Sequence, residues 1–227
     1  MSSSSVPEDL KARLKASYDA IAPKYNEWAI ANSAQRLKYL DRLLALLPLS
    51  DQSQKIHILE LGCGCGIPVT QKLLSHPNVV VTANDLSSAQ ISLANGNLQH
   101  NHGEDASNRL VFEEGDMAAL SFRDGSLDAV IGLYSIIHLP RAEQAELLGK
   151  IAGWLKPGGY LLANFGEEEL ESFVMDSWLD DKDWMFWSGW GREGTIELLR
   201  QVDLRVVVEE VVRDVGDAAF LWVIATR

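Results

Sequence analysis

The chain has 227 residues, 47% of them hydrophobic, and its 32 acidic residues outnumber its 20 basic residues, which gives a formal net charge of −12. This length can bury one sizeable core, so we expect a single domain with an appendage. The negative charge disfavours binding to nucleic-acid phosphates and to anionic lipid surfaces.

The first residues and the two cysteines indicate the cellular compartment. The first ten residues, MSSSSVPEDL, lack a basic segment followed by an apolar run, and no stretch of about 18 apolar residues is uninterrupted. We therefore expect a cytoplasmic protein with no membrane partner. Cys63 and Cys65 are too close together to bridge each other easily, so reduced thiols are expected.

The first 50 residues have a helical pattern. Apolar side chains recur at helical spacing between residues 7 and 47, and Pro23 is expected to break this region. We predict an N-terminal helical cap over residues 1–50 and a core over residues 51–227.

Short apolar runs, typical of strands buried on both faces of a parallel sheet, follow this cap. The predicted strands cover residues 55–61, 79–85, 109–115, 127–134 and 159–165, and the predicted helices between them cover 69–75, 87–100 and 141–155. This alternation predicts a doubly wound α/β fold, with helices on both faces of a mostly parallel sheet.

The C-terminal region departs from that alternation. Two apolar runs, residues 204–215 and 218–226, are joined by Gly216 and Asp217, a pair typical of a tight hairpin. The last strand is therefore expected to be antiparallel.

A glycine-rich loop follows the first predicted strand. Gly62, Gly64 and Gly66 would let a ligand approach the main chain at the carboxyl edge of the sheet, where ligands bind in open parallel sheets. Asp85 ends the second strand, at a spacing suited to binding two ribose hydroxyls. The alternative is a sharp strand-to-helix turn, with Asp85 capping the next helix.

Two other nucleotide-binding motifs are not matched. The dinucleotide fingerprint G-x-G-x-x-G would place a third glycine at position 67, where this chain has Ile67. A Walker-type phosphate loop would require Gly-Lys followed by Ser or Thr, which is absent after these glycines.

Four motifs in order resemble those of the class I S-adenosylmethionine-dependent methyltransferases. They are ELGCGCG at 60–66, NDLSSAQISLA at 84–94, EEGDM at 113–117 and LKPGG at 155–159. The resemblance implies a Rossmann-like methyltransferase fold of seven strands, the antiparallel one inserted between the fifth and sixth. YDAIAPKYNEW, residues 18–28, is similar to the tyrosine-bearing helix that often closes over the cofactor in that family.

The resemblance also implies S-adenosyl-L-methionine as cofactor. By position, Asp85 would bind the ribose hydroxyls, Asp116 would accept from the adenine amino group, and the Leu133 carbonyl would lie near the sulfonium. The residues implied to bind the cofactor are Tyr25, Glu60, Gly62, Cys63, Gly64, Gly66, Asp85, Leu86, Gln90, Asp116, Met117 and Leu133.

The segment after the fourth predicted strand carries the candidate catalytic residues. Methyl transfer from a sulfonium is an in-line displacement, in which a base helps when the nucleophile carries a proton. Tyr134 and His138 are placed for this role, and the ordinary pKa of histidine suits proton removal at neutral pH. The alternative is that His138 caps or packs against the helix that begins at Pro140.

Other chemistries find no support in the sequence. The Asn/Asp-Pro-Pro-aromatic motif usual in methyltransferases of base amino groups is absent, and no carboxylate follows the fourth strand closely enough to bind magnesium. The cysteines are interpreted as small apolar fillers rather than metal ligands. His100, His102 and Glu104 are expected in a solvated loop, so no metal site is predicted.

Aromatic and acidic residues gather in residues 166–191. We predict that Trp184, Trp187 and Trp190 wall a pocket for a flat or apolar small molecule, and that the nearby acids would tolerate a cationic amine. The alternative is a satellite aromatic core whose acidic residues face water.

These observations favour an S-adenosylmethionine-dependent methyltransferase that moves a methyl group to an O, N or S nucleophile of a small organic acceptor. Oxygen is the first expectation. A nicotinamide-dependent oxidoreductase and a catalytically silent cofactor-binding partner subunit are the alternatives. Neither the acceptor nor the oligomeric state is indicated by the sequence.

Overall fold

The computed structural model describes residues 6–213 and 218–227, and the side chains of these residues except 99–107. One seven-stranded sheet has the order β3-β2-β1-β4-β5-β9-β8. Its strands are β1 (Ile56–Leu61), β2 (Val79–Asp85), β3 (Leu110–Glu114), β4 (Leu127–Gly132), β5 (Leu155–Gly166), β8 (Arg205–Arg213) and β9 (Ala219–Thr226).

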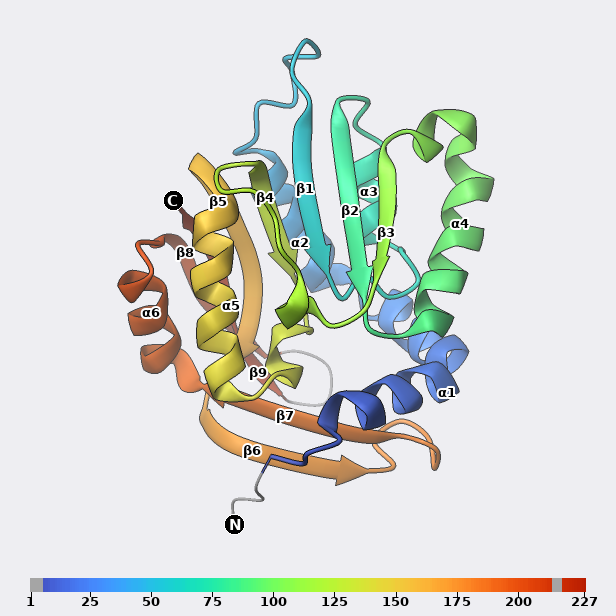
Figure 1. The fold of residues 1–227 in the computed structure, drawn as a ribbon, viewed down its shortest axis with the longest axis vertical. Coiled ribbons are helices and arrows are strands. Elements are labelled where there is room, and N and C mark those ends of the chain that lie inside the picture. The colour runs from blue at the N-terminus through green and yellow to red at the C-terminus, as the bar shows by residue number, and fades with distance from the viewer. Residues whose placement is uncertain (1–5, 214–217) are drawn as a thin grey trace.

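Helices cover both faces of this sheet (Figure 1). The core clusters place α2 (Ala34–Leu44), α3 (Val69–Leu74) and α4 (Ser88–Ser107) on one face, and α5 (Arg141–Trp154) and α6 (Gly191–Gln201) on the other. Within the described ranges, none of the helices is long and apolar enough to cross a membrane.

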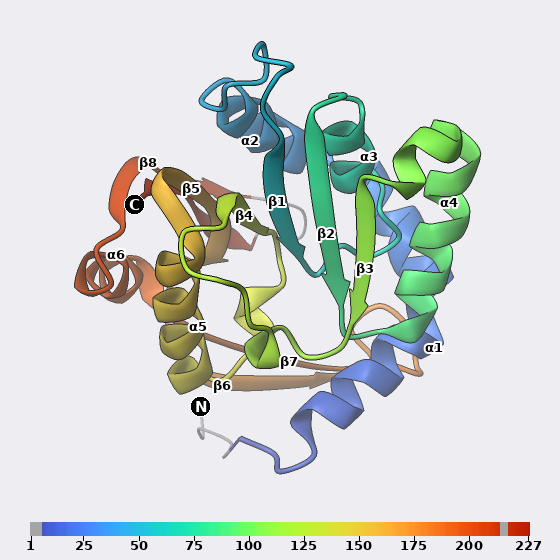
Figure 2. The same ribbon diagram turned by 45° about the horizontal axis from the view of Figure 1, so that its top comes forward.

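Two elements lie across the carboxyl edge of the parallel strands (Figures 1 and 2). One is α1 (Leu10–Ala31), and the other is the two-stranded sheet of β6 (Glu169–Asp176) and β7 (Trp184–Trp190). Leu10, Leu14 and Ile21 of α1 pack against Met185 and Phe186 of β7. This cluster is separate from the two cores beside the sheet, and it covers the carboxyl edge of the parallel strands, where the loops after those strands meet.

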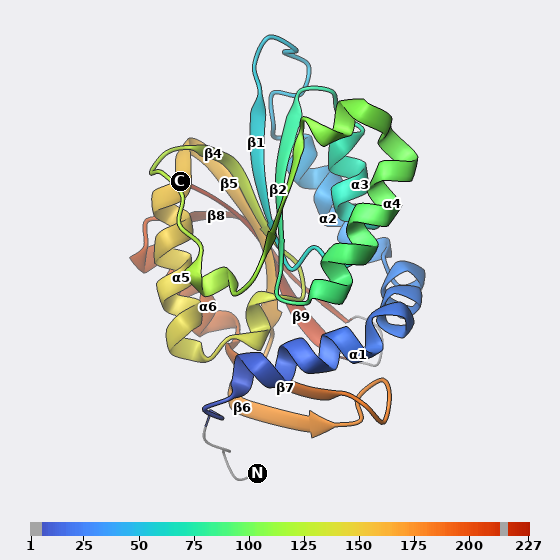
Figure 3. The same cartoon turned by 45° about the vertical axis from the view of Figure 1, so that its right-hand side comes forward.

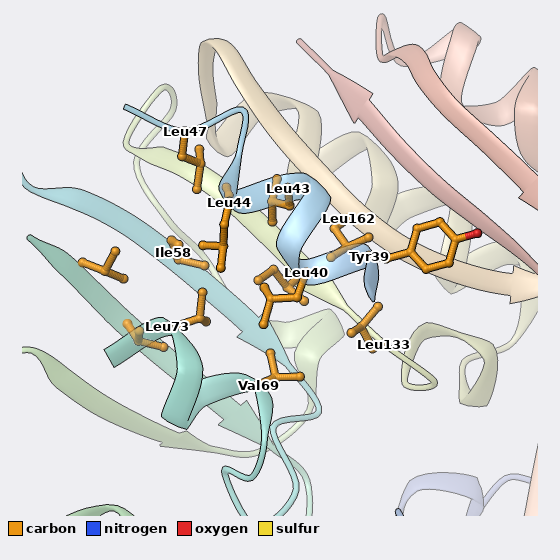
Figure 4. Packing of buried hydrophobic residues seen from close by; sticks show 14 of the residues in the cluster. Tyr39, Leu40, Leu43, Leu44, Leu47, Ile58, Val69, Leu73, Leu133 and Leu162 are labelled. Atoms are coloured by element: carbon orange, nitrogen blue, oxygen red, sulfur yellow. The ribbon is translucent and has the colours of Figure 1, made fainter. Parts of the chain in front are cut away.

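The α2 face shows why an amphipathic helix docks on this sheet (Figure 4). Tyr39, Leu40 and Leu43 project from α2 and are fully buried with Ile58 of β1. The Tyr39 ring stacks on Trp222 of β9 with centroids 4.4 Å apart, and its hydroxyl donates to the Glu210 carboxylate at 2.7 Å. Apolar burial therefore fixes α2 against the strands on which the site is built.

The doubly wound fold and the antiparallel last strand are confirmed. β9 lies between β5 and β8 and is antiparallel to both, and β8 is therefore parallel to the other strands. The turn expected at Gly216 and Asp217 lies outside the described residues. The strands β6 and β7 were not predicted, because their aromatic residues were interpreted as pocket or satellite core rather than as a hairpin.

Three predicted boundaries were wrong. Pro23 does not break α1, because packing against β7 outweighs the single backbone hydrogen bond that proline removes. The α4 backbone continues to Ser107 instead of entering a loop near residue 100, and its last two turns carry almost no apolar side chains that could have revealed it. The strand expected from residue 159 begins at Leu155, which pairs with Leu127 ahead of a register shift.

We predict that truncating the α2 contact destabilises the whole domain. Leu40→Ala removes a fully buried side chain, so the free energy of unfolding should fall by about 2–5 kcal/mol in urea titration. Leu46→Ala is the matched control, because Leu46 is 44% exposed and its loss should change the free energy by no more than about 0.5 kcal/mol. Equal losses in the two variants would contradict the packing described here.

Candidate functional site

The loop after β1 depends on glycine at two positions. Gly62 and Gly64 have φ values of 73° and 56°, which favour glycine over other residues. A Cβ at Gly62 would lie 2.5 Å from the Cβ of Ser135, so the loop and the segment after β4 approach each other at main-chain distance. This leaves backbone of the loop facing a small cavity, which Gly62 and Gly64 both line.

Asp85 connects this loop to the end of β2. Its carboxylate accepts the N–H of Gly64 at 2.8 Å and the N–H of Ser87 at 2.9 Å. Burial raises the pKa of Asp85 to about 6, and the two N–H groups oppose that rise. The Ser87 bond lies just ahead of α4, so the carboxylate supports the helix start as well as facing the cavity.

Gln90 gives the same cavity an unsatisfied polar group. Both its side-chain oxygen and its side-chain nitrogen are buried, and neither has a hydrogen-bond partner in the protein. Buried polar atoms are nearly always paired in native proteins, so an unpaired amide on a cavity wall indicates a ligand. Asp116, Met117, Leu86 and Leu133 line the cavity with it.

Helix α1 lies across the carboxyl edge of the sheet (Figure 3) and contributes Lys11 and Leu14 to the lining of this cavity. Lys11 forms salt bridges with Asp116 and Glu143, and Lys15 donates to the Ser88 hydroxyl at 2.6 Å. The Asp19 carboxylate accepts the Ala89 N–H at 3.0 Å. The volume of this cavity is about 80 Å³. Small-molecule pockets span about 300–1,000 Å³, so the cavity by itself is smaller than the site of a nucleotide-sized ligand.

Three other residues predicted to bind the cofactor, Glu60, Cys63 and Gly66, lie in or next to the glycine loop but away from the cavity. Glu60 is 5% exposed and accepts a hydrogen bond from the Thr70 hydroxyl at 2.6 Å, and burial raises its pKa to about 8. Cys63 is buried, and burial raises the pKa of its thiol. At Gly66 a Cβ would lie 2.8 Å from Leu98. None of these three residues is on the cavity wall.

A second cavity of about 550 Å³ adjoins the first. Tyr18, Tyr25, Tyr134 and His138 line both cavities and therefore mark the junction between them. The remaining aromatic side chains on the larger wall are Trp28, Phe173, Trp178, Trp187 and Phe220.

Only one of the three tryptophans predicted to bind substrate, Trp187, lines this larger cavity. Trp184 is buried under Arg13, whose guanidinium carbon lies 3.9 Å from the ring centroid. Trp190 donates its ring N–H to the Arg141 carbonyl at 3.1 Å. These two side chains follow the satellite-core alternative, because they pack the β6–β7 sheet against its neighbours.

The junction holds His138 in one tautomer. Its Nδ1 lies 2.7 Å from the Phe186 carbonyl oxygen, which can only accept, so Nδ1 carries the proton. Nε2 is then the acceptor, and the Tyr18 hydroxyl donates to it at 2.8 Å. Burial lowers the pKa of His138 to about 4, so the ring is neutral at pH 7.

Tyr134 adopts a conformation uncommon for its residue type. Its φ is 56°, and its N–H donates to the Asn164 side-chain oxygen at 2.7 Å. Such φ values in residues other than glycine concentrate at functional sites. Arg36 of α2 lies over the Tyr134 ring, with its guanidinium carbon 4.1 Å from the centroid.

The described side chains contain no group of three His, Cys, Asp or Glu residues that could hold a metal ion. The side chains of His100, His102 and Glu104 are not among those described. Sequence reasoning missed Arg36, Trp28 and the cavity-lining role of Tyr18. Tyr18 and Trp28 lie in the motif at residues 18–28 that resembles the cofactor-covering helix, which indicated the helix but not a second cavity beside it. The spacing of Arg36 on α2 is that of an ordinary amphipathic helix, so no sequence signal separates it from other residues of that helix.

Comparison with known proteins agrees with this fold. Residues 58–159 match the family model described as "Methyltransferase domain". The Burkholderia thailandensis 1,6-didemethyltoxoflavin-N1-methyltransferase, solved with 1,6-didemethyltoxoflavin and S-adenosylhomocysteine, superposes with a TM-score of 0.74 at 17% identity, covering 100% of this chain and 92% of the other. The [4+2]-cyclase SpnF superposes with a TM-score of 0.72 at 18% identity, and the superposition covers 100% of this chain and 99% of the cyclase chain.

A curated relative gives the closer match in sequence. The 27-O-demethylrifamycin SV methyltransferase of Amycolatopsis mediterranei is 33% identical over 121 residues, which are 53% of this chain and 41% of that protein. The chain matches less than half the length of each of the first curated relatives. The sheet order and these superpositions define the Rossmann-like fold of S-adenosylmethionine-dependent methyltransferases. Within that fold, residues 58–159 are similar in sequence to the methyltransferase-domain family.

We predict that Glu60 makes the stability of the domain depend on pH. The folded state keeps the Glu60 proton up to about pH 8, whereas the unfolded state releases it near the ordinary glutamate pKa of 4.5. The stability contribution is therefore fully present below 4.5 and lost as the pH rises to about 8. Glu60→Gln should match the wild type near pH 4.5 and exceed its free energy of unfolding by about 1–4 kcal/mol at pH 8.5.

Urea titrations at several pH values measure this difference. Glu113→Gln is the control, because Glu113 is exposed on β3 and its replacement should follow the wild type throughout. A Glu60→Gln difference that stays constant between pH 4.5 and pH 8.5 would contradict the assignment.

Proposed function

We propose that this chain is an S-adenosylmethionine-dependent methyltransferase that transfers a methyl group to a small organic acceptor. One observation carries the proposal: the Asp85 carboxylate is fixed to the Gly64 N–H beside the unpaired Gln90 amide, in a cavity that opens at the His138 junction toward a larger aromatic one. A nucleotide-type site and an acceptor site then meet at four shared residues.

The residues of the smaller cavity fit the cofactor by chemistry. Asp85 would accept hydrogen bonds from the ribose hydroxyls, and Gln90 would gain the partners it lacks. Gly62 and Gly64 would leave main chain open to the methionine moiety. Asp116 would bind the adenine amino group once Lys11 releases it. When bound, the cofactor supplies an electrophilic methyl group on a sulfonium.

The chain's own contribution is to orient the acceptor, exclude water and handle a proton. Walls formed by Trp28, Trp178 and Trp187 would limit the access of water to a bound acceptor. At the junction the Tyr18 hydroxyl already donates its proton to His138 Nε2, so its oxygen lone pairs remain available to an acceptor N–H or O–H. A proton leaving the acceptor would pass to Tyr18 while the Tyr18 proton moves to His138.

The acceptor atom is proposed to be oxygen, with nitrogen and sulfur as alternatives. The relatives do not choose among them, since their names include a 27-O-demethylrifamycin SV methyltransferase, a phosphoethanolamine N-methyltransferase and a sterol 24-C-methyltransferase. The cavity of about 550 Å³ is within the range of small-molecule sites. A screen of candidate acceptors with labelled methyl donor tests the activity directly.

We predict that Asp85 controls cofactor affinity. Asp85→Ala removes a charged acceptor, so the Kd for S-adenosylhomocysteine should rise about 10- to 100-fold in isothermal titration calorimetry. Glu113→Ala, an acidic residue exposed on β3, is the control and should leave the Kd unchanged. NAD in parallel titrations tests the oxidoreductase alternative, and preferential NAD binding would overturn the proposal.

The same affinity should depend on pH. Because the pKa of Asp85 is raised to about 6, the ionised acceptor form is lost as the pH falls through 6, and the affinity for S-adenosylhomocysteine should weaken below that value. Asp85→Asn should bind more weakly at every pH and show little change between pH 5 and pH 7. A wild-type affinity that is constant over this range would contradict the role of Asp85.

We predict that the Tyr18–His138 pair acts in the chemical step. With an acceptor found by the screen, His138→Ala should lower kcat by about 10²–10⁴-fold, and Tyr18→Phe should give a loss of the same kind, because each variant interrupts proton transfer. The Kd for S-adenosylhomocysteine should change little in His138→Ala. Parallel losses of kcat and cofactor affinity would instead indicate a structural role.

A further inference from the structure

The larger cavity contains a cation whose function nothing above explains. Arg36 is 8% exposed and lines this cavity, yet it is not among the residues that line the cofactor cavity. One guanidinium nitrogen donates a long hydrogen bond to the Asn32 carbonyl at 3.3 Å. No described carboxylate lies within salt-bridge distance, 4.0 Å, of this guanidinium.

The neighbours of Arg36 hold it in place without neutralising it. The Tyr134 ring lies under the guanidinium, a stacking contact that orients the plane. Burial raises the pKa of Tyr25, and the neighbouring Arg36 guanidinium opposes that rise. The Tyr25 phenol is therefore neutral at pH 7, and no described carboxylate compensates the positive charge of Arg36.

The other charges on the cavity wall are placed differently. Glu168 and Glu169 lie at the β5–β6 end and are exposed, as is Arg213 of β8, while Glu167 is half-buried. Glu169 is also paired with Arg141 at 2.7 Å. Exposed charges are screened by water and salt, whereas a buried one is not. Among the described residues of the wall, the buried charge is therefore the positive one of Arg36, although the chain as a whole is acidic.

A buried guanidinium without a counter-charge costs several kcal/mol, a cost that an anion in the cavity would offset. Arginine presents its N–H groups in a rigid fork that matches a carboxylate, and the stacking on Tyr134 fixes that fork. The aromatic side chains of Trp28, Phe173, Trp178 and Trp187 supply flat apolar walls around it. This combination suits an aromatic acid better than the cationic amine that the acidic composition of residues 166–191 suggested.

We propose that the acceptor is a flat aromatic molecule that carries a carboxylate, and that Arg36 binds this carboxylate and so selects the substrate. The proposal rests on the proposed methyltransferase function, because it assigns the larger cavity to the acceptor. With its acid group on Arg36, the acceptor would extend along the aromatic walls toward Tyr18 and His138 at the junction. Arg36 is thus a specificity-determining residue rather than a catalytic one.

Binding measurements on the full chain saturated with S-adenosylhomocysteine test this proposal. The probes are hydroxybenzoates, hydroxynaphthoates and hydroxyquinoline carboxylates, each compared with its own primary amide, and the readout is quenching of intrinsic tryptophan fluorescence. Because a hydrogen bond to a charged group is the stronger kind, at least one acid should bind about 10-fold or more tightly than its amide. Equal or weaker binding of all the acids, or no binding by any probe, overturns the proposal.

Variants identify the residue responsible. Arg36→Gln should abolish the preference for the acid, and Arg36→Lys should retain part of it as a point charge. Arg42→Gln is the matched control, because it removes the same group from the same helix at a position paired with Glu210 and outside the cavity wall. A preference that survives in Arg36→Gln, or is lost in Arg42→Gln, overturns the assignment.

A further experiment tests whether Arg36 binds the carboxylate of the acceptor or that of the cofactor. S-adenosylhomocysteine has an amino-acid carboxylate and 5′-deoxy-5′-methylthioadenosine does not, so Arg36→Gln should bind each as the wild type does. Selective weakening of S-adenosylhomocysteine would assign Arg36 to the cofactor and overturn the proposal. Failure of wild-type protein to bind S-adenosylhomocysteine would instead overturn the proposed function, so the two failures are distinguishable.

Discussion

The contact between the Asp85 carboxylate and the Gly64 N–H is the constraint on which the site depends. It joins the ends of two neighbouring strands, so the glycine loop and the second strand present one continuous surface. The glycine at position 62 is required by the same geometry, since its loop passes too close to Ser135 to admit a Cβ. Everything that the cavity offers a ligand, including the unpaired Gln90 amide, is arranged around this contact.

The sequence predicted the sheet well because the sheet is built from local signals. Continuous apolar runs identified its strands, and Gly62, Gly64 and Asp85 follow strand ends, where the topology brings them together. The lining of the larger cavity was harder to predict, because it is assembled from α1, α2, β5, β6, β7, β8 and β9, many of which are distant in the sequence. Aromatic composition could not distinguish Trp187 on the cavity wall from Trp184 in the satellite core.

The acidic residues that give the chain its net charge and the cation Arg36 differ in burial. Its acidic residues give a strongly negative total charge, but many of them are on the surface, as Glu168 and Glu169 are. Arg36 is held inside, stacked on a tyrosine whose own backbone is in an uncommon conformation. Net charge therefore bears on binding to nucleic-acid phosphates and anionic lipid surfaces, which it disfavours, and it gave no information about the charge on the cavity wall.

The ion pairs that attach α1 beside the smaller cavity are accessible to the surrounding solution. Lys11 and its partners Asp116 and Glu143 have side chains that are 33%, 26% and 32% exposed, so dissolved ions reach them. Salt screens such partly exposed pairs, while the apolar contacts of Leu10 and Leu14 with β7 are not weakened in the same way. Ionic strength therefore acts on the contact that Lys11 makes with Asp116 on the cavity wall and leaves the apolar packing of α1 on β7 in place.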